Sequence, residues 1–156
     1  MNEESLLTDT VRALIGQTSA PRVVRIETLA VQRLMEALGD RRPLKLEPGA
    51  AAPIYALSLL QPDAEALALP IDLPGSLVAG DEWDVMLGSG GPRIGEPLTV
   101  TSRIIDISER FSGRYGQMLY LRCEWSFSRA DGSLVASARR ITGHYRSPAP
   151  EEPRDG

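Results

Sequence analysis

The segment QMLYLRCEWSFSRA, residues 117–130, has the clearest periodic pattern of hydrophobic and polar positions in the sequence. Its apolar positions are Leu119, Leu121, Cys123, Trp125 and Phe127, and the positions between them are Tyr120, Arg122, Glu124, Ser126 and Ser128. A period of two is typical of a β-strand, because successive side chains point to opposite faces of a sheet. The pattern therefore predicts a strand with one buried face and one face at least partly in water.

Further strands are predicted on both sides of this one. The Asp-Gly pair at 131–132, of the kind that tight hairpins favour, joins it to a strand in LVASARRITGHYR (134–146). The segment LTVTSRIIDISER (98–110) is long and rich in β-branched residues, and LVAGDEWDVML (77–87) is another candidate strand. With these segments, the C-terminal half of the chain is predicted to be mostly strand. In the N-terminal half, PRVVRIE (21–27) predicts one short strand.

Two helical segments are predicted before these strands. The first is TLAVQRLMEALGD, in which Thr28 can cap the N-terminus and Gly39 follows the last apolar residue as a stop. Its residues Leu29, Leu34 and Leu38 fall near one face of the helix. We therefore expect this face to pack against the rest of the protein.

The second helical segment is almost apolar all round from Ile54 to Leu60, and a helix turn without a polar face belongs in a core. Pro62 is suited to begin a further short helix, with Asp63 and Glu65 in its first turn. The order is thus strand, helix, buried helix and several antiparallel strands. It predicts an α+β hot-dog fold, in which an antiparallel β-sheet wraps around a central apolar helix.

Length and composition fit a single domain. The 156 residues are sufficient for one hydrophobic core, which we place in residues 1–146. Residues 147–156, SPAPEEPRDG, contain too few apolar side chains to fold and predict a disordered C-terminal tail. No apolar stretch approaches the roughly 20 residues that span a bilayer, and the acidic start MNEESLLTDT is unlike a secretory signal. We expect a cytoplasmic protein without a membrane partner.

Cysteine, histidine and charge exclude several kinds of site. The single cysteine, Cys123, excludes an internal disulfide and a cysteine-cluster zinc site, and the single histidine, His144, excludes a His-rich metal centre. We expect no metal site, and a packing role for Cys123 on the apolar face of its strand. The net charge is −4 and the pI about 5.1, without a basic stripe. A nucleic-acid surface is therefore not expected.

Several pieces of the chain resemble a known family in their order and spacing. The resemblance is to the N-terminal type of MaoC-like dehydratase domain, among the hot-dog proteins of (R)-specific enoyl-CoA hydratases and 3-hydroxyacyl dehydratases. It covers most of the chain from about residue 22 to residue 146. The matching pieces are RLMEALGDRRPL (33–44), AAPIYALSLL (51–60), AGDEW (79–83), IGEPLTVTSRIIDISER (94–110) and DGSLVASARR (131–140).

The resemblance implies a catalytic turn that this chain carries in altered form. In catalytic members the turn reads like Gly-Asp-x-Asn-Pro-(Ile/Leu)-His, and its Asp and His bind and activate the water that adds to the acyl double bond. The matching residues are Gly39, Asp40, Pro43 and Leu44. Arg42 stands at the Asn position and Lys45 at the His position, and Ala79 replaces a histidine often found in the following strand segment.

Hydration of a thioester-conjugated alkene needs a group that accepts a proton from water near neutral pH. A lysine has an ordinary pKa of roughly 10.4, so Lys45 could serve as a base only if burial lowered its pKa by several units. Asp40 alone is a weak base. The resemblance therefore implies a hot-dog subunit that binds the acyl chain and pairs with a partner supplying the Asp and His.

The site residues that we predict fall into two groups. Asp40 and Lys45 are the catalytic candidates, although Asp40 can also be read as a turn residue and Lys45 as a solvated lysine. The substrate-binding candidates are Tyr55, Leu57, Gly80, Arg41, Arg42 and Arg110. The arginines suit the phosphates of CoA, with a solvated role as the alternative.

No cofactor is implied besides the thioester substrate, carried by CoA or acyl-carrier protein. We expect a homodimer, or a heterodimer with a second hot-dog protein. Three other functions stay open: a homo-oligomeric hydratase that uses Asp40 with Lys45 or His144, a non-catalytic acyl-thioester binding module, and a thioesterase.

Overall fold

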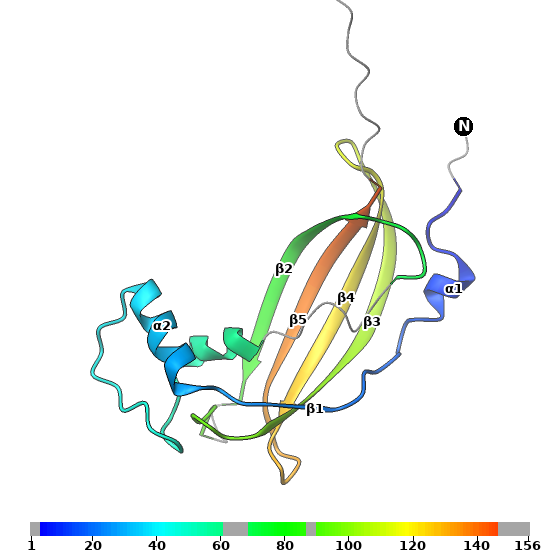
Figure 1. Ribbon diagram of the computed structural model, residues 1–156. Coiled ribbons are helices and arrows are strands. Elements are labelled where there is room, and N and C mark those ends of the chain that lie inside the picture. The colour runs from blue at the N-terminus through cyan, green and yellow to red at the C-terminus, as the bar shows by residue number, and fades with distance from the viewer. Residues whose placement is uncertain (1–3, 61–68, 87–89, 147–156) are drawn as a thin grey trace, which may run out of the picture.

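The computed structural model describes residues 4–60, 69–86 and 90–146. Its elements follow one another in the order helix, strand, helix, 3-10 helix and four long strands (Figure 1). They are α1 (Asp9–Arg12), β1 (Arg22–Val24), α2 (Thr28–Leu38), η1 (Ile54–Leu60), β2 (Gly75–Val85), β3 (Leu98–Ser112), β4 (Gly116–Ser128) and β5 (Leu134–Tyr145). The predicted α+β class is confirmed, and the predicted second helix from Pro62 and the predicted disordered tail lie outside the described residues.

The strands form one antiparallel sheet in the order β1-β3-β4-β5-β2. Figure 1 shows the four long strands side by side in a curved sheet. The β4–β5 connection uses the predicted Asp-Gly turn: Gly132 has φ 85°, and Asp131 accepts hydrogen bonds from the backbone N–H and the hydroxyl of Ser133. Glycine tolerates this left-handed conformation without steric cost, so the turn is encoded locally.

β4 carries the alternation that the sequence predicts. Its buried residues include Leu119, Leu121, Cys123, Trp125 and Phe127, and every residue between them is half-buried or exposed. The buried set meets apolar residues of β3, such as Ile104 and Ile107, in one core cluster. The face of β4 toward the core is therefore as predicted, and the opposite face is the outer face of the sheet.

Two details of α2 differ from prediction. Its buried residues are Val31 and Met35, whereas Leu29 is 56% exposed and Leu38 is 58% exposed. Residues four apart lie on the same side of a helix, so Val31 and Met35 alone form the face that packs against the core. Leu29 and Leu38, at the two ends of the helix, lie outside this face. Thr28 is the first helical residue and Glu27 is the N-cap; the Thr28 hydroxyl donates instead to the carbonyl of Leu46 at 2.8 Å.

The predicted buried helix is a 3-10 helix, η1, which contacts α2 (Figure 1). Ala56, Leu57 and Leu60 belong to the core, but Ile54 is 54% exposed and Leu59 is 40% exposed. The prediction of burial all round was therefore wrong, since only one side of this segment faces the core. Among the described residues, no helix is long and apolar enough to cross a bilayer.

The N-terminal segment covers the β3 side of the sheet. The N–H of Gly16 donates to the carbonyl of Ile104 at 2.8 Å, and the N–H of Ser19 donates to the carbonyl of Ser102 at 2.8 Å. Val11, in the preceding helix α1, is fully buried. At the other side, β2 pairs with β5 and with no second strand of the described chain. The long free edge of the sheet in the described structure is therefore β2.

The two phenylalanines of the chain provide a matched test of the core. Phe127 is fully buried on β4, with its ring 5.6 Å from that of Trp83, and Phe111 is 75% exposed. We predict that Phe127→Ala lowers the free energy of unfolding by about 3–5 kcal/mol in urea titrations, because it opens a cavity and removes apolar contacts. Phe111→Ala should change it by less than about 0.5 kcal/mol. Equal losses from the two variants would contradict the described core.

Candidate functional site

The turn after α2 is built by backbone hydrogen bonds at the helix end. Gly39 adopts a left-handed conformation, with φ 69° and ψ 21°. Its N–H donates to the carbonyl of Glu36 at 3.1 Å, and the N–H of Asp40 donates to the carbonyl of Met35 at 2.9 Å. This pair of bonds is the Schellman arrangement that commonly ends helices at glycine. It places Asp40 directly beyond the helix terminus.

Asp40 is held by two side chains, and both of its carboxylate oxygens accept hydrogen bonds. The Arg42 guanidinium donates from Nε to Oδ1 at 2.9 Å and from Nη2 to Oδ2 at 2.6 Å. The Tyr55 hydroxyl, which comes from η1, donates to Oδ2 at 2.6 Å. The backbone N–H of Arg42 adds a bond to Oδ1 at 3.1 Å. We call these three residues the Asp40 cluster.

The Asp40 cluster favours the ionised carboxylate. Hydrogen bonds from Arg42, and then from Tyr55, hold the pKa of Asp40 well below its usual range. The carboxylate in turn raises the pKa of Arg42, and burial followed by the bond to Asp40 raises the pKa of Tyr55. The Asp40 side chain is only 13% exposed, whereas that of Arg42 is 60% exposed. Chemically, the cluster is a saturated anion and not a free base.

The other predicted site residues are not gathered at the Asp40 cluster. Arg41 and Lys45 are exposed, and the side chain of neither forms a hydrogen bond or ion pair with another described residue. Leu57 is buried in the core. Arg110 lies on β3 with its guanidinium 5.8 Å from the ring centre of Tyr120. Among the candidates, the structure therefore joins Asp40, Arg42 and Tyr55 by described contacts.

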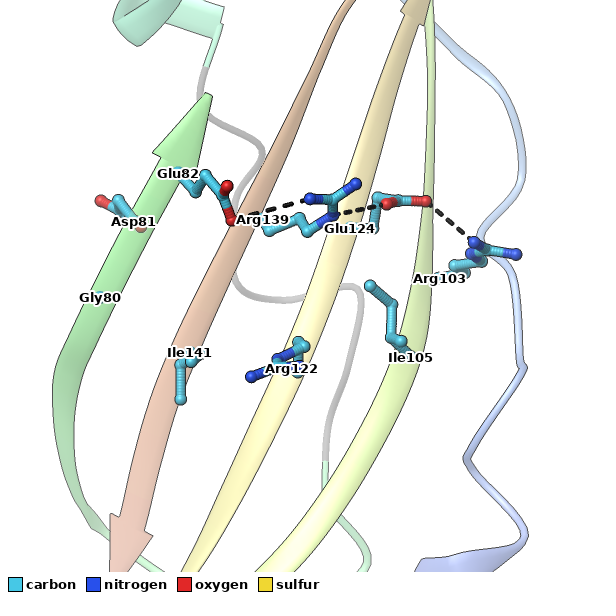
Figure 2. A pocket seen from close by; sticks show the side chains of 9 residues that line it. All are labelled: Gly80, Asp81, Glu82, Arg103, Ile105, Arg122, Glu124, Arg139 and Ile141. Atoms are coloured by element: carbon cyan, nitrogen blue, oxygen red, sulfur yellow. Dashed lines mark hydrogen bonds and ion pairs between the residues drawn. The ribbon is translucent and has the colours of Figure 1, made fainter. Parts of the chain in front are cut away.

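Gly80 lies in β2 and lines a hollow of about 560 Å³ on the outer face of the sheet (Figure 2). The register of β2 shifts between Val78 and Gly80, so Ala79 forms a bulge. The side chains of Arg122 and Ile141 lie in one row across this hollow, with an ion-paired row beside them (Figure 2). The lining of the hollow combines charged side chains of both signs with the apolar side chains of Ile105 and Ile141.

The single histidine and the single cysteine lie on β5 and β4. His144 is half-buried, its Nε2 lies 3.0 Å from the hydroxyl oxygen of Thr142, and burial lowers its pKa. Burial raises the pKa of the Cys123 thiol to about 11, as expected for a packing residue rather than a nucleophile. Within the described ranges, no three His, Cys, Asp or Glu side chains are grouped to hold a metal ion.

Sequence reasoning missed how Arg42 and Tyr55 act together. It treated both as substrate-binding residues, with Arg42 placed at the phosphates of CoA, whereas both donate to the same carboxylate. A basic residue two positions after the turn aspartate was the one available signal for the Arg42 contact. The Tyr55 contact joins residues 15 apart, and no local pattern announces it.

Comparison with solved structures places this arrangement on a known fold. The ChsH1–ChsH2 complex from Mycobacterium tuberculosis is similar at 16% identity, with a TM-score of 0.66, over 95% of this chain and 97% of that one. The HadBC complex, a 3R-hydroxyacyl-ACP dehydratase from the same organism, is similar at 15% identity and a TM-score of 0.64, over 88% and 99%. A MaoC-like dehydratase from Rhodospirillum rubrum is similar at 19% identity and a TM-score of 0.59, over 86% and 94%.

Further matches include (R)-hydratases and a hot-dog-like protein. No protein-family model matches the chain, and no curated protein matches it in sequence. At identities below 20%, the structural matches establish the fold. The chain therefore has the predicted hot-dog fold, in the form shared by solved MaoC-like dehydratases and (R)-hydratases.

Proposed function

We propose that this chain is a hot-dog subunit of an (R)-specific enoyl-thioester hydratase or 3-hydroxyacyl-thioester dehydratase, and that it is not the subunit that moves protons. It binds the acyl chain of a CoA or acyl-carrier-protein thioester and pairs with a catalytic hot-dog partner. The observation that carries this proposal is the saturation of Asp40 by Arg42 and Tyr55.

Water addition to a conjugated thioester requires a base whose proton affinity suits neutral pH. A carboxylate that accepts five hydrogen bonds has a lower proton affinity than a free aspartate, because each donor stabilises the ionised form. For Asp40 to accept a proton from water, one of these bonds would have to break first. Asp40 in this cluster is therefore a weaker base than an unpaired aspartate at the same turn would be.

Neither alternative base is joined to this turn by a described contact. Lys45 is exposed, and so lacks the burial that lets a lysine act as a base. His144 lies on β5 and contacts Thr142. These contacts therefore do not support the alternative hypothesis, a homo-oligomeric enzyme that uses Asp40 with Lys45 or His144.

A binding and pairing role fits the remaining observations. Tyr55 and Leu57 lie on η1, which packs between the Asp40 turn and the core, so the fold of the site is retained around an inert carboxylate. Two of the similar solved structures are described as complexes, ChsH1–ChsH2 and HadBC, and the second is named as a dehydratase. These likenesses support a hot-dog partner for this chain.

We predict that the purified chain alone hydrates crotonyl-CoA no faster than buffer, because it lacks a proton acceptor. The measurement is the loss of enoyl-thioester absorbance, repeated with a longer enoyl-CoA. Co-expression with a small hot-dog protein from the neighbouring reading frame, where it carries the full Asp and His turn, should restore turnover. In that complex, Asp→Asn in the partner's turn should abolish activity, and Asp40→Asn in this chain should leave most of it.

Rapid hydration by the chain alone, lost in Asp40→Asn, would overturn the proposal in favour of the homo-oligomeric enzyme. Binding of the acyl-CoA without turnover in either preparation would favour the non-catalytic module. Hydrolysis that releases free CoA would identify a thioesterase. Each outcome is read from the same two preparations.

The electrostatic basis of the proposal predicts a distinct titration of Asp40. In NMR pH titrations, we expect the chemical shift of its carboxyl carbon to report an ionised carboxylate well below pH 4. Arg42→Ala should raise the pKa of Asp40 toward the ordinary value of roughly 3.9, since the largest stabilising contact is removed. Arg41→Ala is the matched control and should leave the titration unchanged.

The lowered pKa also sets the sign of the pH dependence of stability. Because the folded pKa of Asp40 lies below the unfolded value, its contribution to stability is present above roughly pH 4 and is lost as the pH falls. An Asp40 resonance that titrates in the wild type as it does in Arg42→Ala would show that the ion pair does not form in solution.

A further inference from the structure

A largely buried ion pair lies at the end of the sheet where β4 ends and β3 begins (Figure 1). Arg129, which follows β4, donates from Nε to a carboxylate oxygen of Glu96 at 2.5 Å. The two side chains are only 16% and 17% exposed. In every other ion pair between described residues, at least one side chain is 38% exposed or more. The Glu96–Arg129 pair is therefore the best shielded from water.

Glu96 depends on this one contact. Its second carboxylate oxygen, Oε2, is buried and has no hydrogen-bond partner in the described structure. Removing one partner of a buried pair is costly, because the other charge is left without compensation. Without the Arg129 guanidinium, the Glu96 carboxylate has to move toward water. The backbone that carries it has to move as well.

The same guanidinium holds the other end of the segment 91–96. Its Nη2 donates to the carbonyl of Gly91 at 2.6 Å, while its Nε binds Glu96. Arginine can make both contacts at once because its donors form a rigid planar fork. Arg129 thus fixes the segment at its first and last residues.

The fixed segment 91–96 supports the segment 49–52 by an antiparallel backbone pairing, with Ala51 opposite Arg93. Three backbone hydrogen bonds of 2.8–2.9 Å join the two segments. They run from the N–H of Gly49 to the carbonyl of Ile94, from the N–H of Ile94 to the carbonyl of Ala50, and from the N–H of Ala52 to the carbonyl of Pro92. The position of the segment 49–52 therefore follows that of the segment 91–96.

The segment 49–52 leads directly into η1, which carries Tyr55. Asp40 is placed separately, by the hydrogen bonds of the glycine turn that ends α2. The bond of 2.6 Å from the Tyr55 hydroxyl to Asp40 thus joins two elements with different supports. A small displacement of η1 is enough to lengthen it.

We propose that Arg129 and Glu96 are positioning residues of the Asp40 cluster, which fix the segments 91–96 and 49–52 and so hold the Tyr55 hydroxyl against Asp40. Neither side chain has a described contact with the cluster. The side chains that lower the pKa of Asp40 are Arg42 and Tyr55, so Arg129 acts on Asp40 through position and not through its charge. That this positioning serves acyl binding rests on the proposed function.

The test is a double-mutant cycle read from the NMR pH titration of Asp40 in the full chain. Tyr55→Phe removes one donor and should raise the pKa of Asp40. Arg129→Met should raise the pKa of Asp40 in the same direction, because the Tyr55 hydroxyl is no longer held in place. In Arg129→Met/Tyr55→Phe, the pKa should equal that of Tyr55→Phe alone, since the contact through which Arg129 acts is already absent.

Three controls separate positioning from a general loss of stability. Glu96→Gln keeps an oxygen that accepts from Arg129 and should keep the wild-type titration. Arg103→Met breaks an exposed ion pair on the outer face and should also leave Asp40 unchanged. Phe127→Leu lowers the melting temperature through the core, without a described contact to either segment, and should do the same.

Gly95→Ala disturbs the segment 91–96 without touching the ion pair. Gly95 has φ 73°, which an alanine adopts only with strain, and an added Cβ would lie 3.7 Å from Pro48. This variant should shift the pKa of Asp40 in the same direction as Arg129→Met. It keeps the test decisive if Arg129→Met does not fold.

Additive shifts in the double variant would overturn the proposal, because Arg129 would then act apart from Tyr55. An unchanged titration in folded Arg129→Met and Gly95→Ala, or an equal shift in Phe127→Leu, would overturn it too. Crotonyl-CoA binding, measured by calorimetry, should weaken roughly tenfold in Arg129→Met and stay at the wild-type value in Arg103→Met. A wild-type chain that binds no acyl-CoA would defeat the proposed function alone, because the titration involves no ligand.

Discussion

The structure depends on the burial of one face of β4, the middle strand of the five. Leu119, Trp125 and Phe127 point into the core from alternate positions, and β3 and β5 pair with β4 along most of its length. Because side chains alternate across a strand, a register slip of one residue would turn the outward residues of β4, including Arg122 and Glu124, toward the core. The pairing of three long strands is thereby fixed, and it gives η1 and α2 a surface to pack on.

The same alternation separates two chemistries on the two faces of the sheet. The inner face holds the apolar cluster, with polar pairs such as Asp81–Arg140 toward the β2 side. The outer face carries a row of ion pairs, in which Arg103 and Arg139 both donate to Glu124, and the hollow lies beside this row (Figure 2). Exposed ion pairs of this kind contribute little to stability individually.

The Asp40 cluster shows how a turn can present a carboxylate and at the same time satisfy it with hydrogen bonds. A left-handed glycine at the end of α2 still presents the aspartate beside η1. Arg42 then occupies the carboxylate from two positions away, and Tyr55 occupies it from η1. The result lowers the pKa of the acid when a base would need it higher.

The sequence by itself determined the long strands, the Asp-Gly hairpin and the glycine stop of α2, because each depends on side-chain period or on backbone conformations that glycine adopts. It also determined that no imidazole stands at position 45. The tertiary structure alone decided which side of η1 is buried, which face of α2 packs, and that Tyr55 reaches Asp40. It also brought Arg103, Glu124 and Arg139 into one row. Such contacts join residues far apart in the chain, where no local periodicity records them, and only the folded pairing of strands sets their distances.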